Sequence, residues 1–525
     1  MNAAPAAVRS SVTDRLLAGV ERVGNRLPDP FVLFLLLFGI VAVASTAMAW
    51  ANVSVTVPGS EETTHIRGLF TAEGMSWLTT TLGENYLGFP PLATVLPILL
   101  AVGVAEKSGL LAAMIRRAFG AAPRWALPYA VGLVGVAGSI MADAAFVVIP
   151  PLAALVFKAA GRHPVAGLLG GFAAAGAGYS TSMLVTSLDA LFAGITTAVT
   201  GSLPNPGAPV NPLSNYFFNV VSSAVLILAA GFLIDKVLEP RLVKQAVPRS
   251  QSEDPDEAGG SAAAEVLDPN LTAVERRGLR WSLVLGAVVA GIIAAAALVP
   301  NSPWRNEDGG FLPASPLLSS IVFIVFVIFV VPGLVYGRIT GTMPRAKDIP
   351  RVMGQSIKEM SGFLVLAFVL GQFIALFNWS GIGNWIAVAG ASGLESIGLT
   401  GYPAILAFIV LASLLNLFII SGSAMWTLMA AVFVPMFALL GYEPAFVQAA
   451  FRVGDSATQV LTPLNPYMIV LLTMLRRYEP SAGLGTVISR MLPFTVVFWV
   501  AWVAVLTVFY VFNLPLGPGN GIFIQ

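Results

Sequence analysis

Four ionisable side chains stand inside stretches of this 525-residue sequence that are apolar enough to be membrane spans: Asp143, Asp189, Arg452 and Asp455. A charge at the centre of a bilayer costs about 2.5–3.5 kcal/mol on insertion scales, so each one needs a partner or water. Proton relays and ion or substrate sites in membranes are built from such residues. The sequence therefore points first to an intramembrane charged site.

Arg452 and Asp455 are three residues apart, which places both side chains on one face of an intact helix. We expect them to form an ion pair that works as a switch. A proton on Asp455 would release Arg452 to hold an anionic substrate, and loss of the proton would restore the pair. The alternative is a static ion pair that only fixes packing.

The sequence also carries one motif twice. Residues 178–189, GYSTSMLVTSLD, align without a gap with residues 454–465, GDSATQVLTPLN. Two further similar segments, 138–150 and 422–435, precede the two copies. Interrupted hydrophobic segments at matching places in two halves are the pattern of secondary transporters built from repeats, with the site where the interruptions meet.

Asp189 ends the first copy of the motif, where the second copy has Asn465. A carboxylate opposite an amide suggests that one half handles a cation or proton while the other supplies neutral hydrogen bonds. Alternatively, Asp189 caps the helix that follows it. Asp143 stands where segment 125–158 is expected to turn, so it either takes part in the site or ties down its own turn.

Neutral residues around the second motif complete the candidate site. Trp426 and Ser423 follow a glycine-rich interruption and are suited to holding an aromatic ring, although an interfacial anchor is the alternative for Trp426. Asn416 could coordinate a cation or a carboxylate, or join two helices. Pro444 and Pro463 break helices and free backbone carbonyls.

Nine apolar windows are long enough to span a membrane. They lie near residues 31–50, 86–105, 165–199, 215–235, 280–299, 316–336, 360–378, 445–475 and 488–512. Two other apolar regions, about 125–158 and 401–440, have polar or glycine-rich centres and are expected to be re-entrant hairpins. Non-helical backbone at that depth must be satisfied by protein or water, so the hairpin tips should line the site.

The distribution of basic residues sets the orientation of these hairpins. The first is flanked on both sides by basic residues, namely Arg116, Arg117, Arg124, Lys158 and Arg162. Both of its ends are therefore expected in the cytoplasm, whereas the second lies between loops poor in Lys and Arg and should open outward. The predicted fold class is an all-α polytopic membrane protein with inverted repeats, about nine transmembrane helices and two opposed re-entrant hairpins.

Composition excludes several classes of function. The chain is 57% hydrophobic and 10% charged, with a mean hydropathy of +0.83, which identifies an integral membrane protein. A net charge of +1 gives no reason to expect nucleic acid. Without cysteine, and with His65 and His163 expected in solvated loops, neither a metal centre nor an enzyme is indicated. No cofactor is expected.

The expected organisation has four parts. Residues 1–28 form a cytoplasmic leader, and residues 29–245 form the first half with its hairpin at about 125–158. Residues 246–272 are polar and form a flexible cytoplasmic linker. Residues 273–525 form the second half with its hairpin at about 401–440.

Several strings resemble the p-aminobenzoyl-glutamate transporter (AbgT) family. They are ERVGNRLP at 21–28, GVAEKSGL at 103–110, GRHP at 161–164, FNWS at 377–380 and AFRVGDS at 450–456. The likeness extends from about residue 20 to 512. The first motif copy departs from the family pattern, which commonly has an asparagine and a proline before the aspartate, whereas this chain has SMLVTSLD at 182–189.

The resemblance implies a homodimer in the bacterial inner membrane, with nine spans and two opposed hairpins per subunit and a cytoplasmic N-terminus. The family's important positions correspond to Asp189, Asn416, Ser423, Trp426, Pro444, Arg452, Asp455 and Pro463. It further implies p-aminobenzoate-like carboxylates, or the sulfonamides that mimic them, as substrates. Proton-driven efflux by alternating access is the first expectation, and proton- or sodium-coupled uptake of p-aminobenzoyl-glutamate is the alternative.

Overall fold

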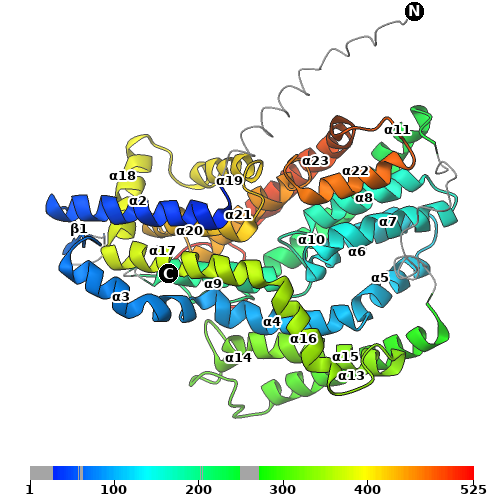
Figure 1. Cartoon of the computed structure of the whole chain (residues 1–525), viewed down its shortest axis with the longest axis horizontal. Coiled ribbons are helices and arrows are strands. Elements are labelled where there is room, and N and C mark those ends of the chain that lie inside the picture. The colour runs from blue at the N-terminus through cyan, green and yellow to red at the C-terminus, as the bar shows by residue number, and fades with distance from the viewer. Residues whose placement is uncertain are drawn as a thin grey trace, which may run out of the picture.

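The computed structural model describes residues 28–524 apart from residues 57, 59–62, 202, 204 and 249–270. The expected leader, except residue 28, and most of the expected linker lie outside these residues. The described chain is mainly helical (Figure 1). A short antiparallel pair, β1 (Ser54–Thr56) and β2 (Thr63–His65), is its sheet.

The helices divide into those before and those after the linker. Before it lie α2 (Pro30–Trp50), α3 (Ala72–Leu87), α4 (Pro90–Lys107), α5 (Leu110–Ala121), α6 (Leu127–Ala137), η1 (Gly138–Met141), α7 (Ala144–Ala159), α8 (Pro164–Ala177), α9 (Ser187–Thr200), α10 (Tyr216–Phe232), η2 (Leu233–Leu238) and α11 (Glu239–Lys244). After it lie α13 (Ala273–Leu298), α14 (Pro316–Ser319), α15 (Ile321–Thr340), α16 (Asp348–Glu359), α17 (Ser361–Ser380), α18 (Ile382–Ser396), α19 (Tyr402–Asn416), α20 (Gly422–Leu439), α21 (Pro444–Thr458), α22 (Pro466–Arg476) and α23 (Leu484–Val511).

Eight helical segments of the described chain are long and apolar enough to cross a membrane. Seven correspond to expected spans, and the eighth is α20, an arm of the second hairpin. The other two expected spans, 165–199 and 445–475, are each two shorter helices separated by irregular backbone. We call these interruptions break 1 (residues 178–186, between α8 and α9) and break 2 (residues 459–465, between α21 and α22).

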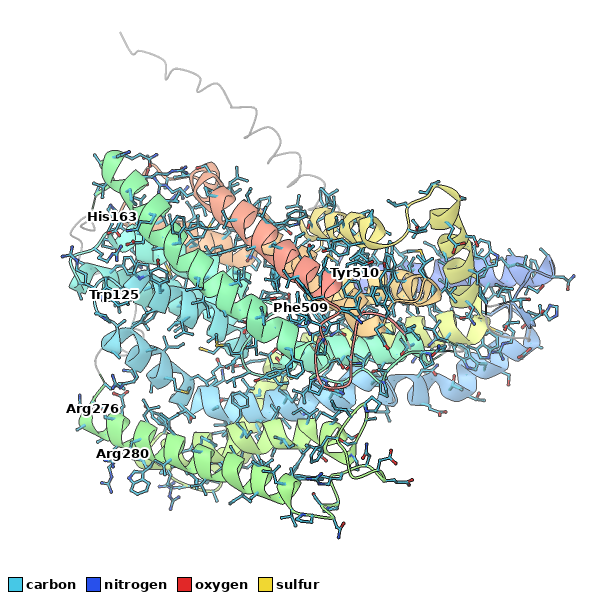
Figure 2. All side chains as sticks on the ribbon, turned by 180° about the vertical axis from the view of Figure 1, so that it is seen from behind. Trp125, His163, Arg276, Arg280, Phe509 and Tyr510 are labelled. Carbon is cyan, nitrogen blue, oxygen red and sulfur yellow. The ribbon has the colours of Figure 1, made fainter. Side chains whose placement is uncertain are left out.

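Hairpin 1 consists of α6, η1 and α7. Its two ends meet, because Arg124 Nη2 donates to the carbonyl oxygen of Gly161 at 3.3 Å and Arg162 Nη1 donates to that of Arg124 at 3.0 Å. Figure 2 shows Trp125 and His163 at the same end of the molecule. The segment therefore enters and leaves on one side, as predicted.

Hairpin 2 consists of α19 and α20, and its ends also lie together. Tyr402 at the start of α19 and Tyr442 after α20 both contact the ring of Tyr510, with centroids 4.4 and 6.4 Å away. The C-terminal segment joins this cluster, where the amide of Glu443 donates to the carbonyl oxygen of Ile522 at 2.9 Å.

The two halves run in opposite directions. Helix α8 starts at the ends of hairpin 1 and α21 starts at the ends of hairpin 2. Beyond break 1, α9 packs against α20 and α21, whereas beyond break 2, α22 packs against α7 and α8. Each broken helix thus reaches the hairpin of the other half, which confirms the inverted arrangement.

Small residues allow the central helices to pack closely. All residues of α8 are buried, and its sequence, PVAGLLGGFAAAGA, is mostly Gly and Ala. A Cβ on Gly167 would lie 2.4 Å from the carbonyl oxygen of Ala153 in α7, so only glycine permits this backbone approach. Figure 1 shows α13 and α15 along one edge, outside this centre.

Three local expectations need correction or completion. His163 is fully buried, with Nε2 3.0 Å from the carbonyl oxygen of Val247, so the solvated loop position expected for it is wrong. Between the expected spans 31–50 and 86–105, where the sequence predicted no helix, the structure has the strand pair and also α3, whose hydroxyl-rich sequence gave little signal. Helix α18 occupies part of what was expected to be an outer loop.

Candidate substrate and coupling site

The two motif copies meet at equivalent positions. The hydroxyls of Ser180 in break 1 and Ser456 in α21 contact each other, and the Ser180 amide donates to Ser456 Oγ at 3.0 Å. Contact between equivalent residues of inverted repeats places the pseudo-twofold axis between them. The centre of the molecule is therefore where the interruptions meet, as the sequence predicted.

Side chains from other segments satisfy the irregular backbone. In break 1, the Thr181 carbonyl oxygen accepts from Ser139 Oγ of hairpin 1 at 3.2 Å. In break 2, Thr462 Oγ1 donates to the Leu417 carbonyl oxygen at the end of α19 in hairpin 2, at 2.8 Å. Hairpin 1 thus supplies a partner to the backbone of break 1, and break 2 supplies one to the backbone of hairpin 2, as non-helical backbone needs at membrane depth.

Arg452, which is 1% exposed, forms its ion pair across the two halves. Its Nη1 lies 2.8 Å from Asp189 Oδ1 and donates to the Ser180 carbonyl oxygen at 2.7 Å. Its Nε donates to Asn215 Oδ1 at 3.1 Å. The expected pairing of Arg452 with Asp455 is therefore wrong in this conformation: the guanidinium reaches across to a carboxylate already fixed at the start of α9.

Asp189 caps α9, which is one of the two roles that the sequence left open for it, and it is also the ion-pair partner of Arg452. Its Oδ2 accepts from the amide and the hydroxyl of Thr186, each at 2.8 Å, in a capping box at the start of α9. Its Oδ1 accepts from Asn219 Nδ2 at 3.0 Å as well as from Arg452. The cap holds the carboxylate where the guanidinium can reach it.

Asp455 is fully buried, and neither carboxylate oxygen has a hydrogen-bond partner in the described structure. An unpaired carboxylate in such a place is costly when ionised. A carboxylic acid group is much less costly to bury, so this geometry suits the protonated form. Asp455 therefore differs from Asp189, whose oxygens all face donors.

Asn416 joins hairpin 2 to α21. Its Nδ2 donates to the backbone carbonyl of Asp455 and to Thr458 Oγ1, the latter at 2.9 Å, while Oδ1 has no partner among the described residues. Of the alternatives left open by the sequence, this conformation shows the interhelical contact.

Trp426 and Ser423 occupy the first turns of α20. The Trp426 indole is fully buried and donates to the Phe192 carbonyl oxygen at 3.2 Å and to Thr196 Oγ1 at 3.1 Å. Its ring lies 4.6 Å from that of Phe451. Ser423 is half-buried, 3.1 Å from the Ser421 hydroxyl. Trp426 thus contacts α9 directly, which rules out its being an interfacial anchor.

The two prolines lie at opposite ends of α21. Pro444 starts the helix, about 12 Å along the axis from Arg452, and Pro463 lies within break 2. Glu443 precedes Pro444 and accepts from the Ala208 amide at 2.9 Å. Burial raises the pKa of Glu443 above its usual value, and the hydrogen bond from Ala208 opposes that shift.

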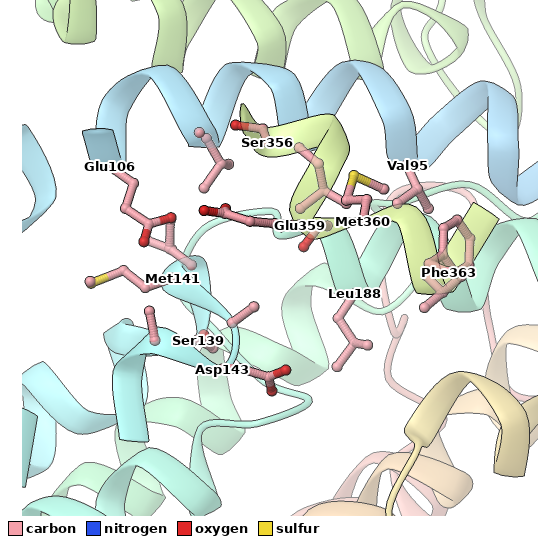
Figure 3. A pocket seen from close by; sticks show the side chains of 18 of the residues that line it. Val95, Glu106, Ser139, Met141, Asp143, Leu188, Ser356, Glu359, Met360 and Phe363 are labelled. Atoms are coloured by element: carbon pink, nitrogen blue, oxygen red, sulfur yellow. The ribbon is translucent and has the colours of Figure 1, made fainter. Parts of the chain in front are cut away.

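A cavity of about 360 Å³ lies between α4, α16 and the tip of hairpin 1. Figure 3 shows the carboxylates of Glu106, Glu359 and Asp143 projecting toward it. Lys107 Nζ lies 2.7 Å from Glu359 Oε1 at its edge. Tyr179 of break 1 also lines the cavity, and its hydroxyl and Asp455 Oδ2 both lie close to Gly422.

Sequence reasoning missed Asn215, Gln448 and Tyr179. Gln448 contacts Thr196 at 2.7 Å and Asn215 at 2.8 Å, next to Arg452. Gln448 is a polar amide inside the expected span 445–475, and that position is the signal by which the sequence could have identified it. Tyr179 lies within the repeated motif, aligned with Asp455, and that equivalence is the signal for it in the sequence.

Comparison with known proteins gives one consistent result. The family model of the AbgT transporters matches residues 15–524. The p-aminobenzoyl-glutamate transport protein of Escherichia coli (strain K12) is 38% identical over 511 residues, which is 97% of each chain. The Alcanivorax borkumensis YdaH transporter, described as having an unusual topology, superposes with a TM-score of 0.86 at 35% identity, covering 94% of this chain and all of its own. Neisseria gonorrhoeae MtrF, described within a class of antimetabolite efflux pumps, gives 0.87 at 34%, covering 96% and 100%.

Proposed function

Because the chain belongs to the AbgT family of transporters, we propose that it exports p-aminobenzoate-like aromatic carboxylates and their sulfonamide mimics in exchange for protons. The observation that carries the proposal is the buried, unpartnered carboxylate of Asp455 one helical turn from an arginine that is paired elsewhere. Similarity to MtrF, described among antimetabolite efflux pumps, supports the direction and the substrate class.

Asp455 is the proton carrier in this proposal. In the conformation described here Arg452 is neutralised by Asp189, so Asp455 has no full counter-charge and is best buried with a proton. Loss of that proton would leave two carboxylates competing for one guanidinium. The arginine would then shift toward Asp455, which changes the contacts between the two halves.

Arg452 is the substrate anchor. Its guanidinium has donors in a fixed fork that matches a carboxylate or a sulfonyl group, and Phe192 lies 5.1 Å beneath it. Asp189, Asn416, Ser423 and Trp426 shape the surroundings, while Pro444 and Pro463 mark the ends that bend when access alternates. In this conformation Trp426 does not line the cavity, so its contact with substrate requires a rearrangement of α20 against α9.

The proposal places a homodimer in the bacterial inner membrane with a cytoplasmic N-terminus. Clustering of basic residues around the ends of hairpin 1 supports this orientation through the positive-inside rule. Under that orientation the cavity at the tip of hairpin 1 is accessible from the cytoplasm.

Proteoliposomes with imposed proton or sodium gradients test the function. Labelled p-aminobenzoate, a sulfonamide and p-aminobenzoyl-glutamate serve as substrates. We expect a proton gradient to drive movement of the first two, and Asp455→Ala and Arg452→Ala to abolish it without loss of membrane insertion. Asp308→Asn, in an exposed loop, is the control.

One alternative has direct support. The E. coli relative is named for p-aminobenzoyl-glutamate transport, so coupled uptake of that compound is the second candidate. Accumulation of p-aminobenzoyl-glutamate driven by protons or sodium, with no gradient-driven movement of sulfonamide, would favour uptake over export.

A further inference from the structure

Tyr179 and Asp455 hold the same position in the two motif copies and converge on one point of hairpin 2. A Cβ built on Gly422 would lie 3.1 Å from Tyr179 Oη and 3.3 Å from Asp455 Oδ2. The Gly422 amide lies within hydrogen-bonding reach of the Tyr179 hydroxyl. Glycine at 422 is therefore what lets a phenol and a buried carboxyl share this small space.

On its other side, Tyr179 faces hairpin 1. It lines the cavity together with Asp143 and interacts electrostatically with both Asp143 and Asp455. Asp143 is exposed to the cavity, and the Tyr467 hydroxyl lies within hydrogen-bonding reach of its carboxylate. Tyr467 is fixed by stacking on Phe146, with centroids 5.3 Å apart.

We propose that Tyr179 and Asp143 form the path by which Asp455 exchanges its proton with the cavity. The Asp455 carboxyl passes its proton to the Tyr179 oxygen while the Tyr179 hydroxyl passes its own to the Asp143 carboxylate, with a water completing any gap too wide for a direct hydrogen bond. One proton leaves Asp455, one arrives at Asp143, and Tyr179 ends neutral. Asp143 then releases the proton to water in the cavity.

The charged surroundings support this direction of transfer. Arg452 lies one helical turn from Asp455 in α21 and can pair with its carboxylate once the proton has left. Tyr467 faces Asp143, and Glu106 and Glu359 line the same cavity, with Lys107 paired to Glu359. A cavity with three carboxylates and one lysine attracts protons.

The path rests on the proposed proton coupling, and its test must separate the two. Net transport driven by a proton gradient requires the proton to enter and leave Asp455. Counterflow of labelled against unlabelled substrate without a gradient requires only that the substrate-loaded carrier switch between its inward-facing and outward-facing conformations. Residues of the path should therefore affect the first measurement and leave the second intact.

The variants are Asp143→Asn and Tyr179→Phe, each of which removes the transferable proton at nearly constant shape. Asp143→Glu keeps a titratable carboxyl and is expected to retain transport. Tyr402→Phe is the matched control, because it also loses a hydroxyl contact, 2.7 Å from Thr507, but far from the cavity. Proton flux is followed with a trapped pH indicator alongside labelled p-aminobenzoate.

We expect Asp143→Asn and Tyr179→Phe to slow proton-driven transport by about 10²-fold, the lower end of what a positioned proton-transfer group supplies, with counterflow unchanged. Normal driven transport in both variants would overturn the path alone. Equal loss of driven transport and counterflow would also overturn it, and would assign these residues to substrate binding or architecture. No proton dependence in the unmodified protein would instead refute the proposed coupling, and the path with it.

Discussion

The same chemical change at two buried aspartates should have very different effects on stability. Asp189→Asn and Asp455→Asn each replace a fully buried carboxylate with an amide of nearly equal shape. Asp189 accepts four hydrogen bonds, one of them from Arg452, whereas Asp455 accepts none among the described residues. We therefore expect Asp189→Asn to destabilise strongly and Asp455→Asn to have little effect.

The magnitude follows from the contacts. Removing one partner of a buried ion pair costs about 3–5 kcal/mol, because the remaining charge stays buried without compensation. An amide at position 189 also turns its NH₂ toward either Thr186 or Arg452, both of which are donors. An amide at position 455 replaces a group that made no hydrogen bond, so its cost should stay below about 1 kcal/mol.

Unfolding in mixed micelles titrated with SDS, followed by tryptophan fluorescence, measures both free energies of unfolding relative to the unmodified protein. Asp308→Asn in an exposed loop serves as the control and should change nothing. Equal destabilisation by Asp189→Asn and Asp455→Asn would refute the assignment of the ion pair to Asp189. In the double variant Arg452 loses both carboxylates, so the cost should exceed the sum of the two single changes.

Two further predictions concern packing and pH. Gly454→Ala should lower the free energy of unfolding by about 1–3 kcal/mol, because the added Cβ would lie 2.5 Å from the Cβ of Ala412 in α19. Gly393→Ala in α18 is the control, since a Cβ there has nothing within 4 Å. Equal thermal unfolding midpoints for the two variants would contradict the close approach at Gly454. Glu443→Gln should flatten the pH dependence of the free energy of unfolding. Burial raises the pKa of Glu443, so the folded state holds this proton at a higher pH than the unfolded chain does. The stability that the proton contributes at low pH is lost as pH rises above 4.5 through the folded pKa. Thermal unfolding at stepped pH measures the slope, and an unchanged slope in Glu443→Gln would contradict this account.

The broken repeats could be predicted because their signals are local. Glycine-rich interruptions in apolar segments and basic residues on both sides of hairpin 1 follow directly from what a bilayer tolerates. The capping of α9 by Asp189 was also readable, since Thr186 and Asp189 have the spacing of a capping box. These features depend on neighbours in the chain.

The choice of partner for Arg452 could not be predicted, because it depends on distant residues. Helical spacing favoured Asp455, but Asp189, Ser180 and Asn215 reach the guanidinium only after the two halves have packed. The burial of His163 has the same origin: its partner, the Val247 carbonyl, lies beyond α11. Sequence placed the correct charges in the centre of the molecule but could not say which of them would touch.

The contact between Ser180 and Ser456 has a consequence for how the transporter turns over. If the two halves exchange conformations, Ser180 and Ser456 exchange roles, but their contact on the pseudo-twofold axis stays the same. This contact can therefore persist as a pivot throughout the transport cycle. Tyr179 and Asp455 lie just off that axis and would trade places. In the opposite-facing form we expect Asp455 to stand where the phenol now stands, at the wall of a cavity opened beside hairpin 2, in contact with water from the other side of the membrane.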